Sequence, residues 1–222
     1  MTIPNDGTPL FGSRWIDLRP DIAAAISLTI KAGWDVACKQ LRIKPDDYEV
    51  PITESVRDGM REALEALPWR KTMVILPGTE SRSDPSRTTP NGCTDIPRIL
   101  IEIYLRGENH DPHAIIECKR VAGEDRALCR KYVVDGVDRF RSGQYSRNHS
   151  NGFMAGYVID GDVVSVIASI IKYLKDHVRT EELLRDSELV RAKWAWQSTH
   201  ERATVGLPIW LHHAVLQFCF PN

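Results

Sequence analysis

The sequence lacks the features of membrane, secreted and highly charged proteins. It contains no run of about 18 apolar residues that could form a transmembrane helix, and its N-terminus lacks the basic and then apolar order of a signal peptide. Lys and Arg number 29 against 30 Asp and Glu, so the formal net charge is -1 and no global field attracts nucleic acid or an anionic membrane. We therefore expect a cytoplasmic protein without a membrane partner, in which any polyanion site is a local patch.

Cysteine patterns and the common catalytic motifs are also missing. The five cysteines are odd in number and none belongs to a C-x-x-C pair. This argues against a disulfide framework and against a structural zinc site. A Walker P-loop, G-x-G-x-x-G, H-E-x-x-H and G-x-S-x-G are all absent, so the usual nucleotide-binding, zinc-protease and esterase functions have no support.

The apolar content, 42% of 222 residues, is sufficient for one core of good size. Apolar residues at every fourth position from Ile22 to Trp34 predict an amphipathic helix from Pro20 to near Arg42. The later elements expected from the pattern are a helix over 52–67, strands over 72–76, 94–106 and 113–120, a helix over 125–141, a strand over 152–160, a helix over 163–174 and strands over 189–202 and 208–219.

This order of elements predicts a single α/β domain with a mixed central sheet flanked by helices. Residues 1–45 are expected to form an N-terminal helical appendage. Residues 49–160 would form the core, and residues 161–222 would add a helix and two strands at its C-terminal side.

Acidic and basic side chains meet in the predicted hairpin of residues 94–120. Alternation along a strand places Glu117 and Lys119 on one side and Cys118 on the other. If the two strands pair antiparallel, Asp95 at the start of one comes close to Glu117 at the end of the other. Two carboxylates and the backbone carbonyl of Cys118 could then hold a hard divalent cation such as Mg²⁺, with Lys119 beside it. A structural interpretation is also open, because a charged pair at a strand end is usually a solvated edge.

Two segments here resemble motifs of the PD-(D/E)XK, or restriction-endonuclease-like, nuclease superfamily. Thr94-Asp95-Ile96 is similar to its first-acid motif, and Ile116-Glu117-Cys118-Lys119-Arg120 to its E-x-K motif. The resemblance covers residues 49–160. It implies an αβββαβ nuclease core, to which this chain adds the N-terminal helix and the two C-terminal strands. Pro97 departs from the pattern, because it removes a hydrogen-bond donor from the strand.

The same resemblance implies a Mg²⁺ or Mn²⁺ cofactor, DNA as substrate and products with a 5′-phosphate. The family often adds a Glu from the first core helix to the site; Glu49 is the candidate here and Glu54 the alternative. Residues 132–145 resemble a segment of uncharacterised bacterial members, some of them in phage-defence loci. Arg139 and Gln144 in that segment are the expected contacts to phosphate or to metal-bound water, although most basic residues there suit a solvated helix face equally well.

A second group of polar residues follows Trp194 and Trp196 near the C-terminus. Ser198, His200 and Arg202 share one face of a predicted strand, so they could line the cleft and contact a nucleic-acid phosphate. A structural role is open for all three. A lone His on a strand, for example, is more often a hydrogen-bonded structural residue than a catalyst.

These observations favour a metal-dependent nuclease in which Asp95 and Glu117 hold the cation and Lys119 stabilises developing negative charge. Replacing either acid is then expected to abolish cleavage without loss of stability. Near-neutral charge suggests that an oligomer or a partner protein helps to deliver the DNA. The alternatives are a non-catalytic nucleic-acid-binding or assembly subunit with the same fold, and an unrelated α/β enzyme whose E-x-K tripeptide is accidental.

Overall fold

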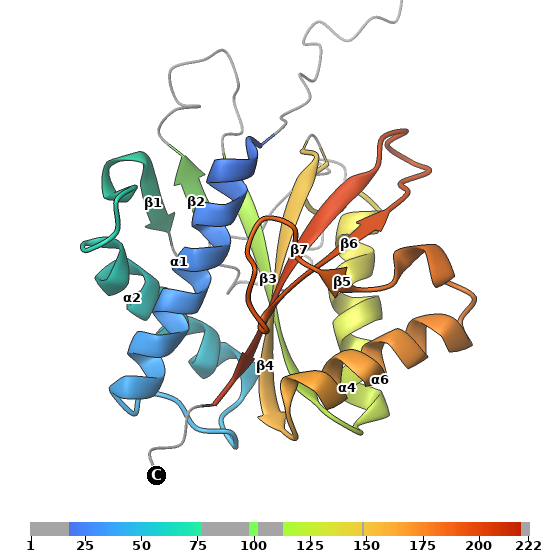
Figure 1. Ribbon diagram of the computed structural model, residues 1–222, viewed down its shortest axis with the longest axis horizontal. Helices are drawn as coiled ribbons and strands as arrows, with labels where there is room; N and C mark the ends of the chain where they lie inside the picture. The colour runs from blue at the N-terminus through green and yellow to red at the C-terminus, as the bar shows by residue number, and fades with distance from the viewer. Residues whose placement is uncertain (1–17, 77–97, 102–112, 148, 219–222) are drawn as a thin grey trace, which may run out of the picture.

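The computed structural model describes residues 18–76, 98–101, 113–147 and 149–218 (Figure 1). In this part of the chain the strands form one seven-stranded sheet in the order β1-β2-β3-β4-β7-β6-β5. They are β1 (Met73–Leu76), β2 (Arg98–Ile101), β3 (His113–Ala122), β4 (Asn151–Asp160), β5 (Arg185–Asp186), β6 (Ala195–His200) and β7 (Ile209–Gln217).

The sheet is mixed, as the sequence predicts. The central strands β3, β4 and β7 are parallel, whereas β1, β2, β6 and β5 pair antiparallel with their neighbours. The antiparallel pairing expected of the hairpin is confirmed between β2 and β3, where Arg98 lies opposite Ile115. The short strand β5 was not expected, and the run predicted over 189–202 forms a strand only from Ala195 to His200.

Helices cover both faces of the sheet. The first face packs against α1 (Pro20–Lys39) and α2 (Glu49–Leu64), and the second against α4 (Arg126–Tyr132) and α6 (Val163–Asp176) (Figure 1). Alternation along β3 assigns its side chains to these two layers, since Ile116 and Cys118 join the core under α1 and α2 and Ile115 and Val121 join the other core. None of the helices in the described ranges is long and apolar enough to cross a membrane.

Helix α1 is part of the core, which corrects the prediction of an appendage. Its apolar stripe is fully buried at Ile26 and Trp34. The Trp34 indole stacks on Tyr157 of β4 at 5.4 Å between ring centroids, and its Nε1–H donates to the carbonyl oxygen of Gln217 at the end of β7. The first helix therefore packs on the central strands of the sheet.

A close helix crossing fixes α2 against α1. A Cβ at Gly59 would lie 2.3 Å from the carbonyl oxygen of Gly33, and a Cβ at Gly33 would lie 2.6 Å from the backbone nitrogen of Met60. Only glycine allows the two backbones to approach this closely. The crossing determines where the N-terminal end of α2, and with it Glu49, is placed.

The helix predicted over 125–141 is interrupted. Asp125 caps α4 by accepting hydrogen bonds from two backbone amides, but Val133–Val137 form the π-helical segment η2 before α5 (Asp138–Arg141) begins. A π-helical turn inside an α-helix is rare and often marks a functional site. Here it crosses over β3 and β4, because Gly136 faces the side chains of Lys119 and Met154.

Candidate active site

Glu117 and Lys119 lie on the second face of β3, in the layer covered by α4, η2 and α6. Their backbone partners on β4 are Met154 and Gly156. Glu117 has no exposed surface and Lys119 is 6% exposed. The pair is therefore buried in the protein, in contrast to the solvated strand edge of the structural alternative.

Three oxygen atoms surround the ammonium group of Lys119. Its Nζ is 2.8 Å from Glu117 Oε1, 2.8 Å from Glu49 Oε1 and 2.9 Å from the carbonyl oxygen of Cys118. Burial alone would lower the pKa of Lys119, but the two carboxylates raise it above its usual value. Lys119 is consequently protonated at neutral pH.

Glu49 reaches this group from the first residue of α2. Its Oε2 accepts a long hydrogen bond, 3.4 Å, from the backbone amide of Arg120, beyond the part of β3 that pairs with β2. Glu54, the alternative, is exposed five residues further along the helix. The structure thus brings Glu49 to Lys119 and leaves Glu54 away from it.

Arg139 of α5 provides a second positive charge next to Glu117. Its Nη1 is 3.1 Å from Glu117 Oε1 and 2.8 Å from the hydroxyl oxygen of Tyr145. The guanidinium also lies 5.5 Å from the centre of the Tyr145 ring. Arg139, expected to contact phosphate or metal-bound water, therefore binds one of the candidate acids directly.

The second oxygen of Glu117 is the unusual feature of the site. Glu117 Oε2 is buried and has no hydrogen-bond partner among the described residues. Burial raises the pKa of Glu117, opposed by the charges of Lys119 and Arg139. Buried carboxylate oxygens ordinarily have a hydrogen-bond partner, so this oxygen is the one available to accept a further donor or ligand.

The remaining candidate metal ligands are Cys118 and Asp95. The Cys118 thiol is buried among apolar side chains on the first face, and burial raises its pKa to about 12, so only its backbone carbonyl could serve. Asp95 lies outside the described residues, as does Pro97. Within the described ranges no three His, Cys, Asp or Glu side chains are grouped as a metal site. The donor set seen here, one carboxylate and one carbonyl, is of the oxygen type that Mg²⁺ prefers.

Arg202 does not join this group of residues. Gln144 lies half-buried in the turn after α5, where its backbone amide donates to Ser142 Oγ. Arg202 is 1% exposed, and its guanidinium donates to backbone carbonyls that include those of Ser146 and His149 at 2.9 and 3.0 Å. The prediction of a phosphate contact is thus wrong for Arg202, which joins the segments before β4 and β7.

Ser198 and His200 lie on the same sheet face as Glu117, as alternation predicts. In the pairing of β6 with β7, Ser198 lies opposite Leu211 and His200 lies opposite Ile209. Leu211 and Ile209 both belong to the second core. Both side chains are 1% exposed, so they are interior residues and do not line an open cleft where DNA could bind them. Their predicted role as nucleic-acid contacts is corrected to hydrogen bonding inside the protein.

Their partners are Glu182, His213 and Tyr132, none of which the sequence pattern marks as a site residue. Ser198 Oγ lies 2.7 Å from Nε2 of both His200 and His213. His213 lies on β7, where strand alternation could have placed it on the same face as Ser198. Glu182 lies in the short helix η3 (Thr180–Glu182), which has no periodic pattern to reveal it.

No family model, curated protein or solved structure matches this chain.

Proposed function

We propose that this protein is a nuclease that hydrolyses phosphodiester bonds of DNA and requires Mg²⁺ or Mn²⁺. The observation that carries the proposal is the Glu117 carboxylate, which is fully buried and binds Lys119 and Arg139 through Oε1, while its Oε2 has no hydrogen-bond partner in the part of the chain that the structure describes. Most buried carboxylates with a purely structural role have both oxygens hydrogen-bonded. The free oxygen favours a cation as its missing partner.

The order of elements supports the same proposal. Helix α2, strands β1, β2 and β3, the helical segment 126–141 and strand β4 follow one another along the chain. This is the αβββαβ order of the PD-(D/E)XK superfamily, which the motifs around Asp95 and Glu117 resemble. The E-x-K residues lie on β3, the third strand in that order. Glu49 is the first residue of α2, the helix that precedes the three strands.

Glu117 and the carbonyl of Cys118 would hold the cation, with Asp95 as the expected second carboxylate. When bound, the cation supplies Lewis-acid chemistry, since it draws charge from the scissile phosphate and makes water more acidic. The side chains of the protein act around it. Lys119 stays protonated between two carboxylates, so it would donate hydrogen bonds to a phosphoryl oxygen and would not act as a general base.

Arg139 and Glu49 keep these two groups in place. Arg139 bridges Glu117 and the Tyr145 hydroxyl, which restricts the rotation of the carboxylate. Glu49 accepts a hydrogen bond from Lys119 and from the backbone of β3, so it holds the ammonium beside Glu117. Removing either contact would leave the corresponding group free to turn away from the substrate.

The test is cleavage of plasmid and single-stranded DNA with and without Mg²⁺ or Mn²⁺. Wild type should cleave only with the cation, and Glu117→Gln and Lys119→Met should each lower the rate at least about a hundredfold, the scale of one lost electrostatic contact in the transition state. Lys175→Met, an exposed lysine on α6, is the matched control and should cleave as wild type does. DNA binding without cleavage by the wild type would overturn the proposal in favour of the non-catalytic alternative.

A further inference from the structure

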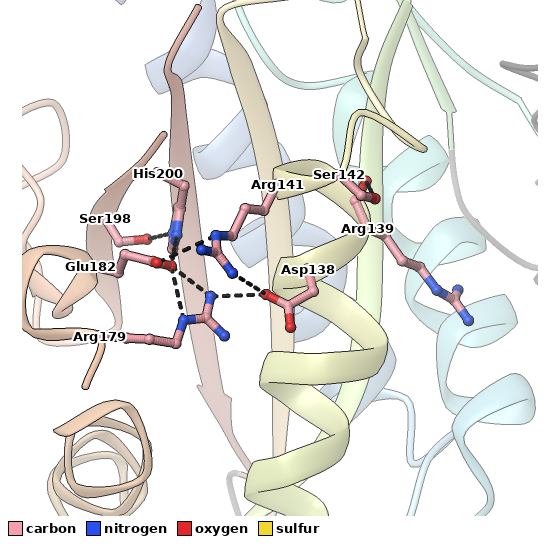
Figure 2. Close-up of polar contacts among 8 residues, drawn as sticks. All are labelled: Asp138, Arg139, Arg141, Ser142, Arg179, Glu182, Ser198 and His200. Atoms are coloured by element: carbon pink, nitrogen blue, oxygen red, sulfur yellow. Dashed lines mark hydrogen bonds and ion pairs between the residues drawn. The ribbon is translucent and has the colours of Figure 1, made fainter. Parts of the chain in front are cut away.

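Five buried polar side chains form a continuous hydrogen-bonded chain beside the candidate site. Glu182 Oε2 lies 2.5 Å from His200 Nδ1, and His200 Nε2 lies 2.7 Å from Ser198 Oγ. Ser198 Oγ lies 2.7 Å from His213 Nε2, and His213 Nδ1 lies 2.8 Å from the hydroxyl of Tyr132. Figure 2 shows the Glu182 end of this chain.

The acceptor at one end determines the direction of every hydrogen bond. Burial lowers the pKa of His200, against the attraction of Glu182, and lowers that of His213 well below its usual value, so both imidazoles are neutral. The Glu182 carboxylate can only accept, so His200 Nδ1 carries the proton and His200 Nε2 accepts from the Ser198 hydroxyl. His213 then donates from Nε2 to Ser198 and accepts from Tyr132. We assign these tautomers because they satisfy every group.

The order Glu, His, Ser resembles the charge relay of a serine hydrolase, but the surroundings exclude that chemistry in this conformation. Ser198 is 1% exposed, and its oxygen already accepts the hydrogen bond from His213. A substrate carbonyl therefore has no access to the nucleophile. The chain must act within the protein.

The chain is connected to both ends of the π-helical segment η2. Tyr132 is the last residue of α4, directly before η2. Asp138 is the first residue after η2, and its Oδ1 is 2.8 Å from Nη2 of Arg179, which also binds Glu182 (Figure 2). The network thus connects Tyr132, before the π-helical segment, to β7. It connects Asp138, after that segment, to β6 through Arg179 and Glu182.

The π-helical segment η2 and the residues directly after it contact the candidate site. Gly136 in η2 lies against Lys119, since a Cβ there would be 3.6 Å from Lys119 Cγ. Arg139, the residue after Asp138, points away from the network in Figure 2, and its Nη1 lies 3.1 Å from Glu117. Movement of either end of η2 would therefore displace Arg139 from Glu117.

We propose that Glu182, His200, Ser198, His213 and Tyr132 are positioning residues that hold the π-helical segment so that Arg139 stays on Glu117. Their catalytic effect rests on the proposed nuclease function, but the structural coupling to Arg139 does not. The network acts through packing and hydrogen bonds, and none of its members touches the substrate.

The test compares the same substitution at two neighbouring histidines of β7. His213→Phe breaks the network, whereas His212→Phe, the control, replaces a buried histidine on the opposite face that is hydrogen-bonded to Asn151. Tyr132→Phe removes only the terminal hydroxyl of the chain. It is the second network variant, to be compared with the control if His213→Phe does not fold. The first readout is ¹⁵N NMR of the full chain, with the guanidinium signals of Arg139 and the histidine tautomers observed directly.

Wild type should show neutral His200 protonated on Nδ1, neutral His213 protonated on Nε2, and an Arg139 guanidinium with restricted rotation. His213→Phe or Tyr132→Phe should release that restriction while His212→Phe retains it. With DNA and Mg²⁺, the same variants should lower kcat about tenfold with KM unchanged. Opposite tautomers, an unchanged Arg139 signal in both folded network variants, or equal effects of the His212 control would overturn the inference. If wild type cleaves no DNA, the nuclease proposal fails while the NMR comparison still decides this one.

Discussion

Removing the charge of Lys119 should destabilise the protein strongly, because it would leave the buried Glu117 carboxylate with less positive charge around it. The Nζ to Oε1 separation is 2.8 Å. At an effective dielectric constant of about 20, two unit charges at that distance attract each other by about 6 kcal/mol. The desolvation of both ions offsets much of this attraction, and loss of one partner of a buried pair typically costs about 3–5 kcal/mol.

The surroundings place Lys119→Met at the lower end of that range. Arg139 still contacts Glu117, and Glu49, whose side chain is one-third exposed, can be hydrated again. We expect a loss of about 3 kcal/mol in the free energy of unfolding. The double variant Glu117→Gln/Lys119→Met removes both charges and should recover about 2 kcal/mol relative to the sum of the single losses.

The measurement is urea unfolding at pH 7.5 of wild type, both single variants and the double variant, with coincident fluorescence and circular-dichroism transitions to establish two-state behaviour. A cost of less than about 1 kcal/mol for Lys119→Met, or two losses that add within about 0.5 kcal/mol, would show that the two buried charges do not stabilise each other. The sequence alone predicts no loss of stability when Glu117 is replaced. The buried ion pair reverses that expectation.

Three further predictions concern the fold around the site. Gly59→Ala should lower the free energy of unfolding by about 3 kcal/mol, measured in urea, because its methyl group would meet the Gly33 carbonyl; a loss under about 1 kcal/mol would contradict the crossing. Burial opposes the ionisation of Glu182, but His200 and its other partners lower the pKa of its carboxyl to about 2. The stabilisation that the ionised Glu182 gives the folded protein is therefore complete above about pH 4.5 and is lost as the pH falls through 2. The stability difference between wild type and Glu182→Gln, at most about 3 kcal/mol, should therefore shrink from pH 5 to pH 2, and a constant difference would argue against this ion pairing. Arg202→Lys should cost about 2 kcal/mol in thermal unfolding and leave DNA affinity unchanged, since its guanidinium binds carbonyls; weaker DNA binding would restore the phosphate role.

The parts of the fold that repeat along the chain were predictable. The stripe from Ile22 to Trp34 predicted α1, and alternation in β3 placed Glu117 and Lys119 together on one face. The pattern over 163–174 predicted α6, which Asp162 caps through Ser165. In each case one local period or one turn residue contains the necessary information.

The errors arose where a period ends or where distant segments meet. Arg202 lies beyond His200, the last residue of β6, so the alternation that orients Ser198 no longer applies to it. The π-helical turn was not predicted because one extra residue in a turn barely disturbs an apolar stripe already broad enough for an α-helix. Glu182 enters the network only through tertiary packing of a short 3-10 helix.

The hydrogen bond between Trp34 and Gln217 also affects how the protein folds, because it joins residues 183 positions apart. Strand β7 lies between β4 and β6, so β4 lacks its neighbour on that side until residues 209–217 have left the ribosome. A nearly fully buried, apolar strand with an open edge is the kind of surface that recruits chaperones or promotes aggregation during synthesis. Such distant pairings also slow folding, since the closure of a long loop precedes the gain from contacts. We therefore expect the central sheet to complete late, only after the last strand has been synthesised.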